Sequence, residues 1–169
     1  MSKTFSDIPD QAAVMLDANI VVYALAPQAR WHAACVRLLE RGARRELTLH
    51  LVVQAAADIL HRVMVLEILA QGTIQHSADA VSYLKRHPQA VQQLRRYKTV
   101  LGDLKRARVN ILPLSYQDLH ASRQYRETHG LMTNDSLIVA VMRRERITHL
   151  ATNDSDFARV PDIAVRGPE

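Results

Sequence analysis

The segment Val14-Met15-Leu16-Asp17-Ala18 decides the fold class of the chain, because three apolar residues are followed directly by an acid. A short apolar run is typical of a strand buried on both faces, as the strands of parallel sheets are. Aspartate is depleted in strands, so Asp17 is expected where this strand ends. Ligands of open parallel sheets gather beyond the carboxyl ends of the strands. The segment therefore predicts both a core strand and a site residue.

Further strands and helices alternate after this segment. Apolar runs predict strands at 47–52, 109–114, 148–152 and 163–165. Helical spacing predicts helices at 32–45, 53–71, 115–129 and 136–146, whereas 19–26 is apolar but ambiguous. Ser115, with Asp118 three residues later, resembles a capping box, and Gly130 marks a helix end. This alternation predicts a three-layer α/β/α domain with a mostly parallel central sheet.

The length of 169 residues suits one domain, which we place at 12–166 after a flexible N-terminus at 1–11. The most basic part is a long helical segment at 76–108, which Pro88 is expected to divide into two helices. Three interpretations of this segment stay open: an arm that contacts RNA, a dimer surface, or a solvated helical insertion. The last interpretation is the ordinary one, because runs of charged residues commonly mark solvated helix faces.

Composition narrows the function classes. Lys and Arg number 22 against 17 Asp and Glu, and the resulting charge of +5 suits a polyanionic partner, although many enzymes are mildly basic. The single cysteine, Cys35, forms no internal disulfide and fits a reducing compartment. No apolar run is long enough for a membrane span, and no signal peptide is visible, so we expect a cytoplasmic protein. Scattered histidines and separated glycines argue against a zinc site or a phosphate loop.

Four aspartates carry the chemical information. Asp135 opens a predicted helix and Asp154 follows a predicted strand, and each alone has an ordinary explanation as a cap or a turn residue. Asp17 and Asp58 are harder to explain in this way, because both lie in apolar stretches. Burying a lone carboxylate costs on the order of several kcal/mol in desolvation free energy unless another group compensates its charge.

If these four carboxylates meet, their mutual repulsion raises their pKa values unless a cation lies among them. Mg²⁺ or Mn²⁺ is the natural cation for an all-oxygen site. Such a cation lowers the pKa of water that attacks a phosphodiester, and a second ion can stabilise the leaving oxygen. The spacing in the sequence leaves open whether the acids meet.

Three blocks resemble the PIN-domain ribonuclease family, in particular its VapC-like toxins. Residues 15–25 resemble the opening strand and turn, where an Asp is followed two residues later by Asn or a hydroxyl residue. Thr133-Asn134-Asp135-Ser136-Leu137 resembles the helix start that supplies a second acid. Thr152-Asn153-Asp154-Ser155-Asp156-Phe157 resembles the closing segment. The blocks occur in the family's order and cover both ends of the domain.

The resemblance implies a metal-dependent endoribonuclease that hydrolyses RNA with Mg²⁺ or Mn²⁺, as the toxin of a toxin–antitoxin pair. It implies that Asp17, Asp135 and Asp154 bind the metal, with Asp58 as a further catalytic acid. It also implies a homodimer and a small antitoxin that blocks the site. The residues expected to hold carboxylates or waters in place are Asn19, Ser136 and Thr152, with Asp156 as an auxiliary acid or a plain turn residue. Thr152 is equally well explained as an ordinary strand-end residue.

The chain departs from the family pattern at two places. Family members usually have a Glu in the helix after the second strand, and the matching position here is Asp58. Because Asp is one methylene shorter, this predicts binding through water or a weaker site. Glu67 lies nine residues further along the same helix and is expected to face elsewhere. The second departure is the long basic segment at 76–108.

Two alternatives from other classes remain. The missing Glu is compatible with a degenerate PIN-like module that binds RNA without cleaving it. In the second alternative the chain is a structural or regulatory partner protein whose acids are caps and turns. That protein would bind no metal, and Asp17→Asn would change its folding stability more than any activity.

Overall fold

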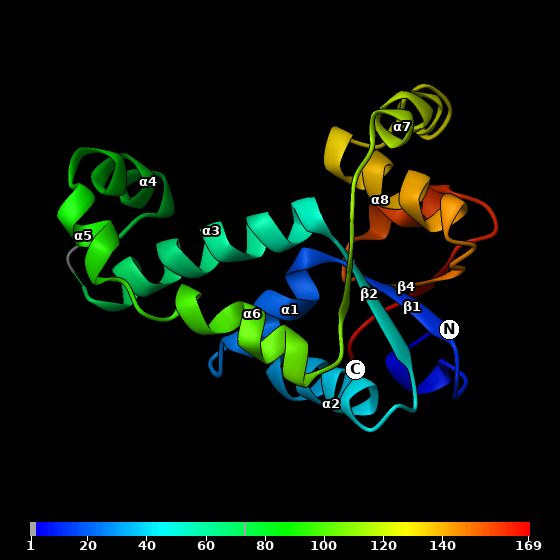
Figure 1. Ribbon diagram of the computed structural model, residues 1–169, viewed down its shortest axis with the longest axis horizontal. Coiled ribbons are helices and arrows are strands. Elements are labelled where there is room, and N and C mark those ends of the chain that lie inside the picture. Colours follow the sequence, from blue (N-terminus) through cyan, green and yellow to red (C-terminus); the bar gives the residue numbers. More distant parts are fainter. Residues whose placement is uncertain (1–2, 73) are drawn as a thin grey trace.

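The computed structural model describes residues 3–72 and 74–169 (Figure 1). Its centre is a five-stranded sheet with the order β3-β2-β1-β4-β5, in which every neighbouring pair is parallel. The strands are β1 (Ala13–Leu16), β2 (Thr48–Val52), β3 (Asn110–Leu112), β4 (His149–Ala151) and β5 (Ala164–Arg166). The predicted α/β class with a mostly parallel sheet is confirmed.

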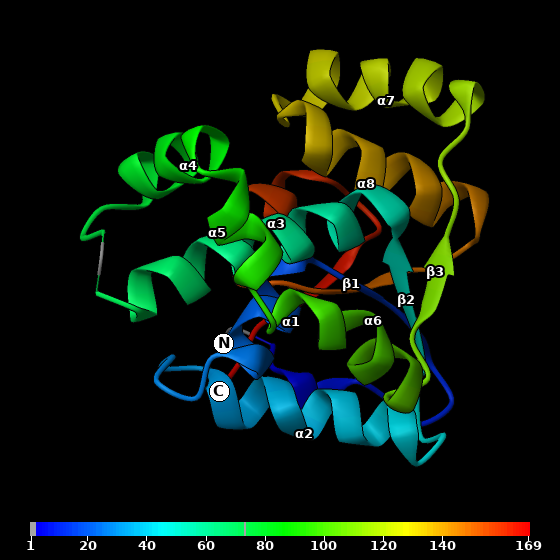
Figure 2. The ribbon, with the colours of Figure 1, turned by 60° about the vertical axis from the view of Figure 1, so that its left-hand side comes forward.

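Helices cover both faces of this sheet. They are α1 (Ala18–Leu25), α2 (His32–Ala43), α3 (Val53–Ala70), α4 (Ser77–Arg86), α5 (Pro88–Gln93), α6 (Tyr97–Arg106), α7 (Tyr116–His129) and α8 (Thr133–Arg144), with 3₁₀ turns η1 (Phe5–Asp7) and η2 (Ser155–Arg159). Helices α1, α2 and α6 lie on one side with the start of α3, and α7 and α8 lie on the other (Figures 1 and 2). None of the helices in the described ranges combines the length and apolar character that a membrane span requires.

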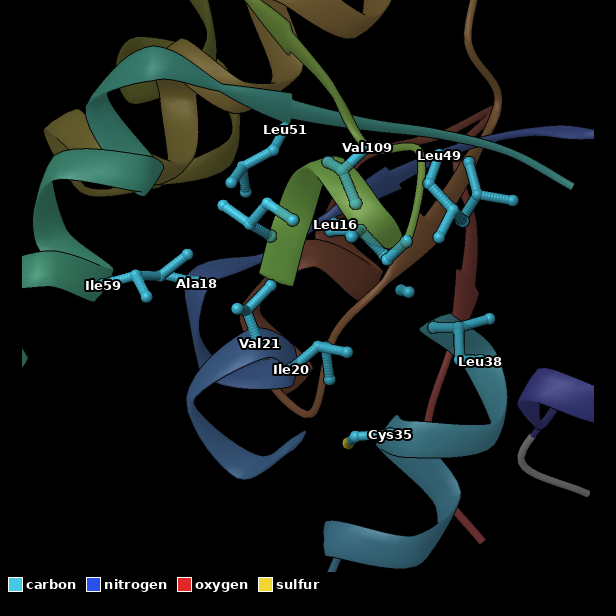
Figure 3. Packing of buried hydrophobic residues seen from close by; sticks show 14 of the residues in the cluster. Leu16, Ala18, Ile20, Val21, Cys35, Leu38, Leu49, Leu51, Ile59 and Val109 are labelled. Carbon is cyan, nitrogen blue, oxygen red and sulfur yellow. The ribbon is translucent and has the colours of Figure 1, made fainter. Parts of the chain in front are cut away.

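The two faces of β1 anchor two hydrophobic clusters. Val14 and Leu16 point into the cluster under α1, α2 and α3, whereas Met15 points into the cluster under α7 and α8. All three side chains are fully buried, which is why this strand is apolar without alternation. Figure 3 shows the first cluster, in which Cys35 is also buried. This burial raises the pKa of the Cys35 thiol to about 12, as expected for a core residue and not for a reactive thiolate.

The basic segment 76–108 differs from the expectation of two helices, because it forms α4, α5 and α6. Pro88 is the first residue of α5, as a proline at a helix start should be. The additional break follows α5, where the Glu67 carboxylate on α3 accepts the backbone N–H groups of Arg95 (2.8 Å) and Arg96 (2.9 Å). This acceptor satisfies free donors before α6, so a new helix begins there. Glu67 thus faces α6, away from the acids.

Helices α4 and α5 pack on the far end of α3 and form with it an arm that projects from the sheet (Figure 1). The arm has its own small hydrophobic cluster, made of Val65, Ile68, Ala80, Leu84 and Leu94. Helix α6 returns to the main body, because Val100 and Leu104 join the cluster under α1 and α2. One end of the segment 76–108 therefore lies in a local core and the other end in the main core, and its role as an RNA-contact arm, a dimer surface or a solvated insertion stays a prediction.

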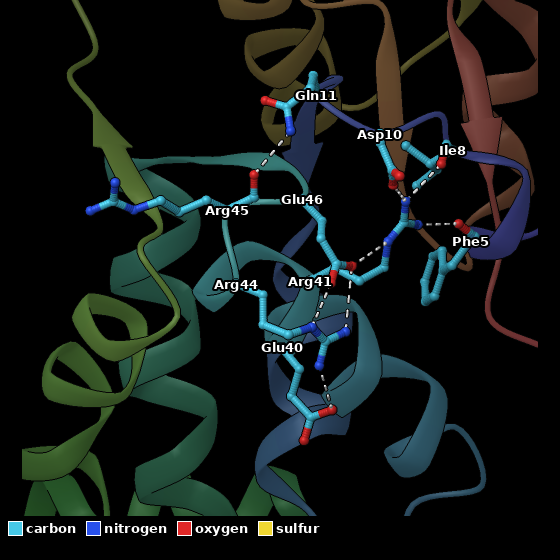
Figure 4. Close-up of polar contacts among 9 residues, drawn as sticks. All are labelled: Phe5, Ile8, Asp10, Gln11, Glu40, Arg41, Arg44, Arg45 and Glu46. Atoms are coloured by element: carbon cyan, nitrogen blue, oxygen red, sulfur yellow. Dashed lines mark hydrogen bonds and ion pairs between the residues drawn. The ribbon is translucent and has the colours of Figure 1, made fainter.

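Residues 3–11 belong to the N-terminal segment 1–11, which we predict to be flexible, and in the structure they pack against α2. Phe5 and Ile8 are buried. Arg41 on α2 donates to the carbonyl oxygens of Phe5 (3.1 Å) and Ile8 (2.9 Å) and pairs with Asp10 at 2.9 Å (Figure 4). The segment is fixed because a residue of α2 satisfies its backbone, a partner that its own sequence does not show. Met1 and Ser2 lie outside the described residues.

Two glycines within helices give opposite expectations on substitution by alanine. A Cβ at Gly42 in α2 would clash with the Leu49 side chain of β2 and lie 2.8 Å from the carbonyl oxygen of Ala107. Gly42→Ala is expected to destabilise the protein by about 1–3 kcal/mol, as overpacking does. A Cβ at exposed Gly102 in α6 would meet only the end of Arg106 at 3.6 Å. Gly102→Ala is expected to stabilise it by about 0.5–1 kcal/mol. Urea unfolding of both variants measures these changes in the free energy of unfolding. Equal changes in the two variants would contradict the close approach of α2 and β2.

Candidate metal centre

The candidate site lies where the order of the strands reverses. From β1 the chain builds β2 and β3 on one side, and it later returns to place β4 on the other side of β1. In such sheets the crevice between the two diverging strands, at their carboxyl ends, is where ligands bind. Asp17 follows β1 directly, and Thr152 follows β4 directly. The two residues thus face each other across the reversal.

Asp17 is held by two neighbours. Its Oδ2 accepts hydrogen bonds from Asn19 Nδ2 and from Thr152 Oγ1, both at 2.7 Å. The same Thr152 hydroxyl accepts the backbone N–H of Asp154 at 3.0 Å, so it ties the loop after β4 to Asp17. Burial raises the pKa of the Asp17 carboxyl, although the bond from Thr152 acts in the opposite direction. Asn19 and Thr152 therefore lie where a supporting role for Asp17 requires them.

Asp135 meets the other acids from the first turn of α8. The helix starts at Thr133, three residues before the predicted 136–146 span, so Asp135 lies inside it. Burial raises the pKa of this carboxyl to about 6, with further contributions from the negative charges of Asp17, Asp154 and Asp156. Asp17, Asp154 and Asp156, from two other segments of the sequence, therefore lie within electrostatic reach of Asp135, and Asp58 is not among the charges that raise its pKa.

Both acids of the loop after β4 make structural contacts within the loop. Asp154 caps η2, because its Oδ1 accepts the backbone N–H of Asp156 at 2.8 Å. Asp156 pairs with Arg159 at 2.7 Å, and its side chain is 38% exposed. In the described part of the chain, the Ser136 hydroxyl makes no contact with the acids that it was expected to hold in place. Its hydroxyl donates to the carbonyl of Thr133 (2.8 Å) and accepts from Arg126 (2.9 Å), so it joins α8 to α7.

A pocket of about 90 Å³ opens beside Asp17 and Asp135. Its polar lining consists of Asp17, Gln54, Asp58, Arg62, Asn134 and Asp135. Asp58 thus points into the site, as the position of the family's Glu implies, but it pairs with Arg62, whose Nε lies 2.7 Å from Asp58 Oδ2. The sequence analysis missed Arg62. The spacing of four residues from Asp58 within a helix is the signal that identifies such a partner.

The donors suit a divalent cation bound largely through water. In the described part of the chain, no three Asp, Glu, His or Cys side chains stand close enough to form a ready set of direct ligands. Mg²⁺, however, usually keeps several waters and binds through one or two carboxylates. The unbalanced negative charge around Asp135 is what a cation would relieve. The oxygen-only donor set and this charge fit Mg²⁺ or Mn²⁺.

Solved structures with a similar fold include components of toxin–antitoxin systems. The VapBC2 complex of Rickettsia felis, bound to a promoter DNA fragment, has a TM-score of 0.58 and 20% identity, covering 93% of this chain and 99% of that one. The VapC20 toxin of Mycobacterium tuberculosis, which cleaves the sarcin-ricin loop, has a TM-score of 0.60 and 13% identity, covering 90% and 98%. A toxin–antitoxin complex from Klebsiella pneumoniae gives 0.52 and 15%, covering 89% and 95%. At these identities the likeness shows the fold.

No curated protein sequence matches the chain. The PIN domain family, in contrast, matches it over residues 14–163, from the strand before Asp17 to the start of the last strand. The matched range includes the pocket and all of the acids around it. It also includes the resemblance blocks at 15–25, 133–137 and 152–157. The chain belongs to the PIN domain family.

Proposed function

We propose that the chain is a metal-dependent endoribonuclease that hydrolyses RNA phosphodiester bonds with Mg²⁺ or Mn²⁺. The observation that carries the proposal is the position of Asp135 at the strand reversal, where burial, together with the negative charges of Asp17, Asp154 and Asp156, raises its pKa to about 6. Such a cluster is unfavourable near neutral pH without a cation. Perturbed acids in a pocket are typical of functional sites.

Asp17, Asp135 and Asp154 would hold the cation, and Asp58 completes the acidic lining of the pocket. The bound cation would supply Lewis acidity, lowering the pKa of the water that attacks the phosphorus. Thr152 and Asn19 both hold Oδ2 of Asp17, which fixes the orientation of its carboxylate. Thr152 also fixes the backbone at Asp154. The chain's own contribution is thus the placement of charge and of the phosphate.

We infer further that the protein is the toxin of a toxin–antitoxin pair, with a small antitoxin as its partner. The structures it resembles include VapBC and other toxin–antitoxin complexes, and one of those toxins cleaves an RNA loop. The surplus of basic residues suits an RNA substrate. Homodimer formation and action in the cytoplasm belong to the same proposal, the latter in agreement with the buried free thiol of Cys35.

The experiment that tests the nuclease is incubation of purified protein with a mixed cellular RNA pool, in Mg²⁺, in Mn²⁺ and in chelator. Defined fragments that need the metal are the expected result. RNA binding without metal-dependent cleavage by a folded protein would favour the degenerate RNA-binding module. Absence of both cleavage and metal binding would favour the structural partner protein.

Thr152→Val tests how the two strand ends are coupled. Thr152 is 1% exposed, and valine has its shape without the hydroxyl that contacts Asp17 and Asp154. We expect Mn²⁺ affinity to fall about 10–100-fold, as for other residues that orient metal ligands. Thr152→Ser keeps the hydroxyl and is expected to restore most of the affinity. Calorimetric Mn²⁺ titration measures both variants, and equal affinity of the valine variant and the wild type would contradict the assigned role.

A further inference from the structure

Arg62 occupies an unusual position for a helical ion-pair residue. It lines the same pocket as Asp17 and Asp135, and among the described residues it is the only cation in that lining. Its side chain is 50% exposed, so it stands at the rim and can be reached from solvent. Arg62 also belongs to the lining of a second, more apolar hollow of about 530 Å³ between α1, α3 and α4. Arg62 thus lies between the acidic pocket and the surface that leads to the arm formed by α3, α4 and α5.

The pairing of Arg62 leaves part of its guanidinium available. Asp58, one helical turn earlier, contacts Nε at 2.7 Å. No hydrogen bond joins the Nη atoms of Arg62 to any residue in the ranges 3–72 and 74–169. The ion pair with Asp58 lies at Nε, on one edge of the planar guanidinium, so the donors of the Nη groups remain available to another acceptor. The comparable pair Arg123–Glu127 on α7 lines none of the pockets near the acids.

A nuclease of this kind has an electrostatic difficulty. The carboxylates that would attract a cation also repel the phosphate that must approach them. A fixed positive group at the rim reduces this repulsion for a phosphate beside the cation. Arginine suits this task, because its N–H groups match phosphate oxygens in pairs. Arg62 also favours the charged form of Asp17, which places the two within electrostatic reach.

We propose that Arg62 binds a non-bridging oxygen of the RNA phosphate through its Nη groups, and that Asp58 is the positioning residue that holds the guanidinium by Nε. This inference rests on the proposed nuclease function and names two contributors to phosphate recognition in the same site. Asp58 pairs with the arginine of its own helix, and the cation would be left to Asp17, Asp135 and Asp154.

The test compares Arg62→Ala, Arg62→Lys and Asp58→Asn with Arg123→Ala, which removes the cation of a matched i, i+4 pair on α7. Steady-state cleavage of a defined single-stranded RNA in Mn²⁺ and Mn²⁺ affinity are both measured. Arg62→Ala is expected to lower kcat/KM by about ten-fold or more, with Mn²⁺ affinity unchanged. Arg62→Lys should recover part of this loss, because it keeps the charge without the planar fork. Arg123→Ala should match the wild type.

Asparagine at position 58 keeps an oxygen that can accept from Nε, so Asp58→Ala, which removes both the charge and the acceptor, is measured beside it and separates positioning from metal binding. Loss of kcat/KM in the same direction as Arg62→Ala, at unchanged Mn²⁺ affinity, supports the proposal. A ten-fold loss of Mn²⁺ affinity would make Asp58 a metal ligand and overturn its positioning role. Unchanged kcat/KM in Arg62→Ala, with cleavage by the wild type intact, would overturn the phosphate contact and leave the nuclease standing.

RNA binding in chelator provides a readout that needs no cleavage. The affinity of the same RNA is measured over a range of salt for the wild type and Arg62→Ala. Loss of one phosphate contact lowers the slope of log K against log salt by about 0.7 for a single strand. That change supports the contact even if the wild type fails to cleave, whereas equal slopes overturn it. Failure of the nuclease proposal and failure of the Arg62 proposal are thus distinguished.

Discussion

Asp17→Asn is expected to reduce metal-dependent RNA cleavage by about two to three orders of magnitude, the scale seen when one charge-stabilising group is removed from an active site. Asparagine keeps the size of the side chain and an oxygen that can accept from Thr152, so the strand ends stay connected. What disappears is the negative charge on the residue best placed to hold the cation. The measurement is the initial rate of fragment formation from a defined RNA in Mn²⁺, with and without chelator.

Asp10→Asn is the matched control, since Asp10 is 74% exposed and pairs with Arg41 far from the pocket. It should cleave at the wild-type rate. Cleavage by Asp17→Asn at that same rate would remove Asp17 from the assigned site. Because burial raises the pKa of Asp17, neutralising it should not destabilise the metal-free fold. A large loss of stability without any metal binding by the wild type would instead support the structural partner protein.

Asp135→Asn is expected to stabilise the metal-free protein at pH 7 by about 1–3 kcal/mol, the upper value being the full pKa shift without solvent screening. The ordinary pKa of this carboxyl is 3.8, and the folded protein raises it to about 6. Between these values the folded state therefore binds a proton that the unfolded chain releases. Stability from this group is present at pH 4 and is lost as the pH rises through 6.

The pH dependence and the metal dependence should therefore be linked. At pH 7, Mn²⁺ should raise the Tm of the wild type by relieving the repulsion, and it should raise that of Asp135→Asn far less. Asp79→Asn is a matched control, because Asp79 is the third residue of α4 as Asp135 is of α8, but it is exposed. Its loss of a helix-start charge should be slightly destabilising. A destabilised Asp135→Asn would show that this carboxylate is an ordinary helix-start acid.

Much of the site could be predicted because its residues follow the ends of secondary structure elements. Asp17 and Asp154 come after strands that parallel pairing brings to one edge, so their proximity follows from the topology. Ser136 shows the limit of this reasoning. Its neighbours in the sequence are site residues, yet on α8 its hydroxyl faces Arg126 of α7. The contact depends on how two helices are rotated against each other, which the local pattern does not contain.

The fold shows the same division. The capping box of Ser115 and Asp118 and the left-handed Gly130 occur as predicted, since these signals are local. The segment 19–26 was ambiguous because an apolar stretch carries no periodicity, and its helix is buried against α2 and α3. The break after α5 depends on Glu67, 28 residues from Arg95 along the chain. Such long-range acceptors decide element boundaries and are not visible in a short window of sequence.

The hydrogen bond between Thr152 and Asp17 joins residues 135 positions apart in the chain. During synthesis, Asp17 leaves the ribosome long before β4 exists, and β1 has no β4 partner until residues 149–151 have also emerged. The proposed acid set is complete only when Asp154 has followed. A nascent chain on the ribosome thus carries an unfinished centre until Asp154 has emerged. An enzyme that cuts RNA would in this way spare the message and the ribosome that are making it.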